Sequence, residues 1–289
     1  MATWKLTLEY DGTRYYGWQE QKNARTVSGE LRIAAEDFFS KPVEIAGAGR
    51  TDAGVHALGQ VARLRTDWRQ KRVDLAHALN DRLPPDINVL KVEEARAGFD
   101  PRREAISRHY LYQISSRRTA FGKRFVWWVK DRLDEGAMRE AAHSLIGRHD
   151  FARFCDKRAE EGSTIVVVNT VQFERDGDLL IFRIGASHFL WKMVRRVVGA
   201  LVETGRGSIG VTEFTSLVDS RPGADNPGRF DIASHTAPPS GLFLEQVVYR
   251  SPSAGMGHNT HLPIPFKNPH SIASENKNDA APKARTKKS

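Results

Sequence analysis

Alternating apolar and polar residues predict a strand at the start of the chain, over residues 4–10, where tryptophan, leucine and tyrosine side chains share one face. Apolar residues then recur at helical spacing over residues 27–38, with Thr26 as the expected N-cap. The elements that follow are a short strand at residues 43–46, a longer strand at 57–66, a short helix at 73–79 and a last strand at 87–92. This β-α-β-β-α-β order is the split-βαβ, or ferredoxin-like, pattern.

The second half of the chain shows the same plan with insertions. A helix over residues 189–204 is expected to end before Gly205, since glycine is common just after a helix. The other elements are strands at 108–115, 165–173 and 179–184, a helix at 133–146 and a closing strand at 242–249. The predicted fold class is therefore α+β, with two ferredoxin-like subdomains, residues 1–100 and 101–250. Their antiparallel sheets would form a central cleft, which suits a substrate too large for a pocket.

Residues 251–289 differ in composition from the rest of the chain. They are rich in proline, asparagine, serine, lysine and alanine and contain few aromatic residues. Such a segment buries too little apolar surface to offset the entropy lost on ordering. We therefore expect a disordered basic tail that catalysis does not need.

Composition allows a sizeable core and points to a polyanionic partner. The chain has 289 residues, of which 40% are apolar, enough for one large domain or two small ones. Its formal net charge is +9 and its pI about 9.7, which favours nucleic acid or an acidic membrane as partner. The tail holds six basic and two acidic residues, so the remainder of the chain keeps a charge of +5.

Several classes of site and location are disfavoured. The single cysteine, Cys155, excludes a disulfide framework and a cysteine-based zinc site and fits a reducing cytoplasm. No His-x-x-x-His pair lies beside a carboxylate, so no metal is expected. No apolar run approaches membrane-spanning length, and the N-terminus lacks the core of a signal peptide.

The glycine-rich segment at residues 46–55 is the strongest candidate for chemistry. Three glycines surround Asp52, and Arg50 precedes it by two residues. Glycine permits positive φ and close approach of a ligand, and an arginine reaches a phosphate or stacks on a base. Asp52 would serve as a nucleophile or base. The alternative is an ordinary turn, which this segment taken alone favours.

Familiar nucleotide and hydrolase motifs do not account for this segment. Gly49 and Gly54 have the spacing of a P-loop, but Val55-His56 follows instead of lysine and serine or threonine. No Gly-x-Ser-x-Gly nucleophile elbow is present. The segment Gly122–Val126 is a poor match to the RNP1 pattern.

The helix expected at residues 189–204 supplies a second candidate, Arg195, on the flank of its apolar face and near Trp191. A half-buried arginine needs an acidic partner. That partner would be Asp52 or any other carboxylate, or the side chain would be solvated. The residues alone leave these alternatives open.

Five segments in order resemble the tRNA pseudouridine synthase A (TruA) family, over residues 4 to about 250. The Gly-Arg-Thr-Asp-Ala-Gly-Val-His string is highly specific. The segments are Tyr10-Asp-Gly-Thr-x-Tyr15 with Gly17-Trp-Gln-x-Gln21, Ala48-Gly-Arg-Thr-Asp-Ala-Gly-Val-His56, Arg108-His-Tyr-x-Tyr112, Phe189-Leu-x-x-Met-Val-Arg195, and Thr236-Ala-Pro with Gly241-Leu-Phe-Leu244.

Two positions depart from the family's pattern. The family usually has histidine before the methionine of its arginine helix, where this chain has Lys192. Members carry an arginine in the strand after the middle loop, whereas residues 165–168 contain none. The RNA contacts that family members make from that strand are therefore not carried over to this chain, whereas the catalytic core is.

The resemblance implies a reaction that uses neither cofactor nor metal. The bond between N1 and C1′ of a uridine breaks, the uracil turns, and C5 joins C1′ to give pseudouridine. The implied substrate is tRNA, bound in the central cleft, at uridines on the 3′ side of the anticodon stem-loop, nucleotides 38–40. Members of the family are homodimers, and a cytoplasmic homodimer is expected here.

The resemblance also implies a role for each site residue. Asp52 acts at the ribose–base junction, and Arg195 holds it as a carboxylate. Tyr110 packs against the extruded base and is a candidate proton acceptor. Arg50 fills the gap that the base leaves, and Leu242 walls the pocket.

Two other classes of function compete with this one. A non-catalytic tRNA-binding or chaperone protein on the same fold would gain nothing from Asp52, because an acid facing RNA phosphates would repel them. A glycosidase-like hydrolase would need two catalytic carboxylates, and this loop offers one.

Overall fold

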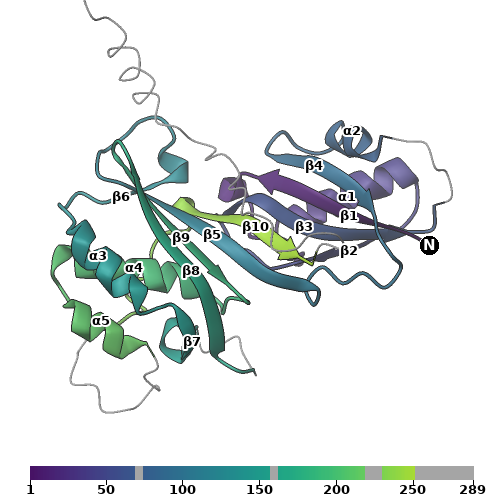
Figure 1. The fold of residues 1–289 in the computed structure, drawn as a ribbon. Helices are drawn as coiled ribbons and strands as arrows, with labels where there is room; N and C mark the ends of the chain where they lie inside the picture. Colours follow the sequence, from purple (N-terminus) through teal and green to yellow (C-terminus); the bar gives the residue numbers. More distant parts are fainter. Residues whose placement is uncertain (69–73, 157–161, 219–229, 251–289) are drawn as a thin grey trace, which may run out of the picture.

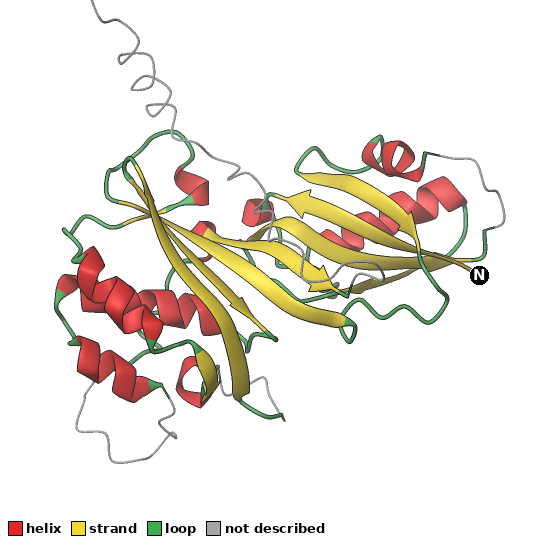
Figure 2. Ribbon diagram, in the orientation of Figure 1, coloured by secondary structure: helices red, strands yellow, loops and turns green. Residues whose placement is uncertain are grey.

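The strands of both halves pair into one large sheet (Figures 1 and 2). The computed structural model describes residues 1–68, 74–156, 162–218 and 230–250, and the predicted tail, residues 251–289, lies outside them. The strands are β1 (Ala2–Tyr10), β2 (Glu44–Gly47), β3 (His56–Thr66), β4 (Ile87–Glu94), β5 (Ala105–Ser115), β6 (Trp127–Trp128), β7 (Gly147–Asp150), β8 (Ile165–Asp176), β9 (Leu179–Ala186) and β10 (Leu242–Tyr249).

The order of the strands is the same in each half. The first half runs β4-β1-β3, with β2 on the far side of β3, and the second half runs β10-β5-β9-β8, with β7 beyond β8. Within each half these pairs are antiparallel, as alternation and the βαββαβ order suggest. The two halves join through a short parallel pairing of β10 with β3, where Phe243 lies opposite His56 and Leu244 opposite Ala57.

The helices form two groups, one against each half of the sheet (Figure 2). The first half has α1 (Val27–Phe39) and α2 (Leu75–Asn80), and the second has α3 (Glu135–His143), α4 (Met193–Arg206) and α5 (Val211–Leu217). Thr26 caps α1 as predicted, since its side chain accepts from the Gly29 N–H. Short 3₁₀ turns lie at Gly12–Arg14, Lys123–Phe125, Ala152–Phe154 and Pro239–Gly241.

One apolar core runs through both halves on the side of the sheet that α4 covers, and it includes Tyr110, Leu242 and Val197. Because neighbouring residues of a strand point to opposite faces, Leu111 belongs to a second, smaller cluster. That cluster consists of Leu58, Leu111, Val126, Leu179, Ile181 and Phe243. The residues of β5 therefore pack on both faces of the sheet. Tyr110 lies on the face that α4 covers.

The bounds predicted for the arginine helix are wrong at both ends. Helix α4 begins at Met193, because Lys192 has a left-handed backbone (φ 61°, ψ 4°) that interrupts the expected helix. It runs to Arg206 and ends at Gly207, whose φ is 78°. Gly205 has a different use: a Cβ there would lie 2.7 Å from the sulfur of Met138, so its small size lets α4 pack closely on α3.

Candidate active site

Asp52 lies in the loop between β2 and β3, and that loop is tied to the sheet at several points. The Ala48 N–H donates to the Val61 carbonyl (2.8 Å). The hydroxyls of Thr51 and Tyr10 are 2.8 Å apart. A side chain carried by such a loop is presented from a fixed backbone, as a reacting group requires.

The first family-like segment, residues 10–21, supports this loop from the other side. The Trp18 N–H donates to the Thr51 carbonyl (3.1 Å), and the Gly54 N–H donates to the Tyr15 carbonyl (3.2 Å). Gly17 has φ of 91°, and a Cβ on it would lie 2.5 Å from the Thr51 oxygen. Glycine is required at Gly17 by both conformation and space.

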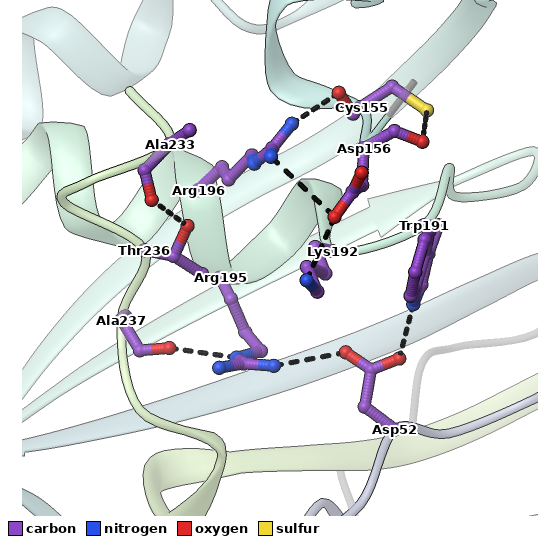
Figure 3. Close-up of polar contacts among 10 residues, drawn as sticks. All are labelled: Asp52, Cys155, Asp156, Trp191, Lys192, Arg195, Arg196, Ala233, Thr236 and Ala237. Carbon is purple, nitrogen blue, oxygen red and sulfur yellow. Dashed lines mark hydrogen bonds and ion pairs between the residues drawn. The ribbon is translucent and has the colours of Figure 1, made fainter. Parts of the chain in front are cut away.

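Arg195 reaches Asp52 from α4, as Figure 3 shows. Its Nη1 donates to Oδ2 of Asp52 (3.1 Å), and its Nε donates to the Ala237 carbonyl (2.8 Å). The side chains of Arg195 and Asp52 are only 15% and 24% exposed, so water screens the pair less than an ion pair on the open surface. Of the alternatives left open by the sequence, the pairing with Asp52 is the one present.

Trp191 holds the other oxygen of the same carboxylate, and sequence reasoning did not identify it as a site residue. Its indole N–H donates to Oδ1 of Asp52 (3.0 Å; Figure 3). The available signal was only its nearness to Arg195 in the sequence, because Trp191 lies before the first residue of α4 and helical spacing does not place it. Both oxygens of Asp52 therefore accept a hydrogen bond, one from Trp191 and one from Arg195.

Tyr110 lies on β5 and is 9% exposed. Its ring meets that of Phe189 edge to face, with the centroids 5.0 Å apart. Burial, followed by the nearby Tyr10 and the charge of Asp52, raises the pKa of Tyr110. Its phenol is therefore protonated at neutral pH.

The two other expected site residues lie in different surroundings. Arg50 is exposed, two residues from Asp52, and forms no ion pair with any acidic residue in the described ranges. Leu242 is the first residue of β10, lies opposite Tyr112 and is 5% exposed within the main core. The Arg50 side chain is thus open to solvent, whereas Leu242 is part of the main core.

Lys192 and residues 165–168, the two places where the sequence departs from the family's pattern, have different surroundings. The Nζ of Lys192 lies 2.8 Å from Oδ2 of Asp156. In β8, Val166 and Val168 are buried, whereas Ile165 and Val167 are 37% and 38% exposed. At residues 165–168 the exposed side of β8 is therefore formed by apolar side chains.

Within the described ranges, no group of three or more histidine, cysteine, aspartate or glutamate side chains is arranged to hold a metal ion. None of the helices that the structure describes has the length and apolar character needed to cross a membrane.

Known proteins resemble the chain over most of its length. A family model described as tRNA pseudouridine synthase matches residues 7–102 and 141–250. A protein of Brucella ovis named tRNA pseudouridine synthase A is 37% identical over 257 residues, covering 87% of this chain and 100% of the relative. A protein of the same name from Brucella canis matches to the same extent. The crystal structure of a Cbf5-Nop10-Gar1 complex superposes loosely, with TM-score 0.31 and 8% identity over 68% of this chain and 53% of that one.

Proposed function

The chain belongs to the tRNA pseudouridine synthase family, and from this membership we propose that Asp52 is the group with which it converts uridine in tRNA to pseudouridine. The protein is an isomerase that acts on tRNA. One observation carries the role of Asp52: a partly exposed carboxylate on a fixed loop, held at both oxygens by Arg195 and Trp191.

The reaction needs the target base outside the helical stack. Extruding a paired base costs a few kcal/mol, which contacts to the RNA backbone offset. Asp52 then bonds transiently to the uridine at the ribose–base junction, the N1–C1′ bond breaks, and C5 bonds to C1′. The bond to Asp52 breaks in turn, which returns the free carboxylate. C5 loses a proton and N1 gains one, so no atom is consumed. Arg195 and Trp191 donate to the two oxygens of Asp52 and orient the carboxylate for the attack.

Binding roles follow for Arg50 and Leu242. Arg50 is exposed beside Asp52, so it reaches into the space that the extruded base leaves or contacts a phosphate. Leu242 supports the base pocket from the core, through the strand that it begins.

Tyr110 packs against the extruded base and takes the proton from C5. Because burial keeps its phenol protonated, it takes that proton only while passing on its own. Tyr110→Phe keeps the ring and removes the hydroxyl, so the single-turnover rate should fall about a hundredfold with tRNA affinity unchanged. Tyr249→Phe is the matched control, since it removes the hydroxyl of another tyrosine, partly buried, that donates to the Pro101 carbonyl. An unchanged rate for Tyr110→Phe would leave the hydroxyl without a chemical role.

The substrate region and the assembly are further parts of the proposal. Residues 1–250 carry a net charge of +5. They bind RNA phosphates along a cleft between two subdomains, residues 1–100 and 101–250. The repeated strand order of the two halves supports this division. The protein acts as a cytoplasmic homodimer, and its targets are the uridines at nucleotides 38–40 on the 3′ side of the anticodon stem-loop.

Mapping pseudouridine in tRNA transcripts tests the function directly. After incubation of unmodified transcripts with the purified protein, pseudouridine should appear at uridines 38–40, and transcripts with cytidine at those positions should stay unmodified. Binding of tRNA with no pseudouridine at any position would instead support a tRNA-binding or chaperone protein. Product at other positions would contradict the proposed target region.

A further inference from the structure

We propose that Asp156, Lys192 and Trp191 form a positioning chain that fixes the orientation of the Asp52 carboxylate. The positioning chain begins at the buried Asp156, which lies outside the family-like segments, and it ends on Oδ1 of Asp52 (Figure 3). This inference rests on the proposed catalytic role of Asp52.

A single donor does not fix a carboxylate. The terminal torsion of an aspartate is broad and roughly two-fold, so with Arg195 alone the group can turn about its last bond. Arg195 holds Oδ2, and the Trp191 indole N–H holds Oδ1 (3.0 Å). Two donors on two oxygens define the plane of the carboxylate, which an attack on one carbon of the substrate requires.

Trp191 is held in turn by Lys192. Trp191 precedes α4, so helical hydrogen bonding does not set its position. The Nζ of Lys192 lies 4.7 Å from the centre of the Trp191 ring and 2.8 Å from Oδ2 of Asp156. The ammonium group therefore links the indole to the aspartate by a cation–π contact and an ion pair.

Asp156 also fixes the backbone on which Trp191 sits. Its own N–H donates to the Trp191 carbonyl (3.2 Å). The Asp156 residue is only 6% exposed, and Arg196 approaches the same carboxylate oxygen at 3.9 Å. These contacts hold Lys192 in a left-handed backbone, which few residues other than glycine adopt without such support.

Two substitutions separate the links of this chain. Trp191→Phe keeps an aromatic ring for Lys192, although a smaller one, and removes the indole N–H, so the single-turnover rate should fall about tenfold to a hundredfold. Asp156→Asn removes the charge that holds Lys192 and should lower the same rate several-fold. Both variants should bind tRNA with unchanged affinity, because neither removes a phosphate contact.

A double-mutant cycle distinguishes positioning from a purely structural role. If Asp156 acts through Trp191, the double variant should be no slower than Trp191→Phe alone. If Asp156 only stabilises the fold, the two effects should multiply, and the proposal would be overturned. Full single-turnover activity of Trp191→Phe would overturn it as well.

Asp131→Asn is the matched control. It breaks the ion pair of Asp131 with Arg206 (2.8 Å) at the other end of α4 and should leave the rate unchanged. Asp52→Asn, assayed alongside, separates the two hypotheses. If it is active, the proposed function fails. If it is inactive while Trp191→Phe is fully active, only the positioning chain fails.

Discussion

Asp52→Asn is expected to abolish pseudouridine formation, with a loss of about 10⁴-fold or more in single-turnover rate, while tRNA still binds. The amide keeps the shape of the side chain and loses the negative charge. Its NH₂ group would also turn a donor toward Arg195 or Trp191, each of which donates to Asp52 in the native protein. The measurement is the yield of pseudouridine from tRNA transcripts at saturating enzyme.

Binding and folding must be followed in the same preparation. The affinity of Asp52→Asn for tRNA should equal or exceed that of the native protein, since a negative charge facing phosphates is removed. Appreciable turnover by purified Asp52→Ala would remove Asp52 from the chemistry. Loss of both binding and folding would show that the residue supports the loop instead.

Arg195→Lys should lower the single-turnover rate about a hundredfold, much more than a swap between two cations usually does. The guanidinium uses two separate nitrogens, Nη1 for Asp52 and Nε for the Ala237 carbonyl. A lysine ammonium is one point charge and cannot reproduce that fork. Arg195→Ala removes the charge as well and should cost about 10³-fold, because it leaves Asp52 without its counter-ion.

The same substitution elsewhere on the helix provides the control. Arg206 lies in the last turn of α4 and pairs with Asp131 and Glu203 near the surface. Arg206→Lys should therefore change the single-turnover rate by less than about threefold, because partly exposed ion pairs contribute little to stability. If Arg195→Lys matched this control, the geometry of the guanidinium would not matter to catalysis.

Local patterns predicted the strands better than the connections between them. The closing strand was predicted with the bounds that β10 has, Leu242–Tyr249. The parallel contact of β10 with β3 left no trace in the sequence, because it depends on two residues from each of two distant segments. The arginine helix was predicted to begin too early because apolar residues continue at helical spacing through Leu190, while the backbone turns at Lys192.

The candidate site was predicted in part for similar reasons. A glycine-rich loop and an amphipathic helix pointed to Asp52 and Arg195, and the geometry brings them together. The partner of Arg195 could not be derived from pattern alone, since any carboxylate would satisfy it. Trp191 was missed because an indole at the border of an apolar face looks like a core residue in sequence, and its hydrogen bond depends on the turn at Lys192.

The placement of β10 has a consequence for the nascent chain. This strand is the last of the sheet to be synthesised, yet it lies between β3 and β5 in the middle of the molecule. Until it emerges, β5 lacks its partner along residues 105–112 and β3 lacks its partner at residues 56–57, and unpaired strand edges favour aggregation. The segment just before it also supplies the Ala237 carbonyl that orients Arg195. The central strand β10 and the carbonyl that orients Arg195 therefore become available together, late in synthesis.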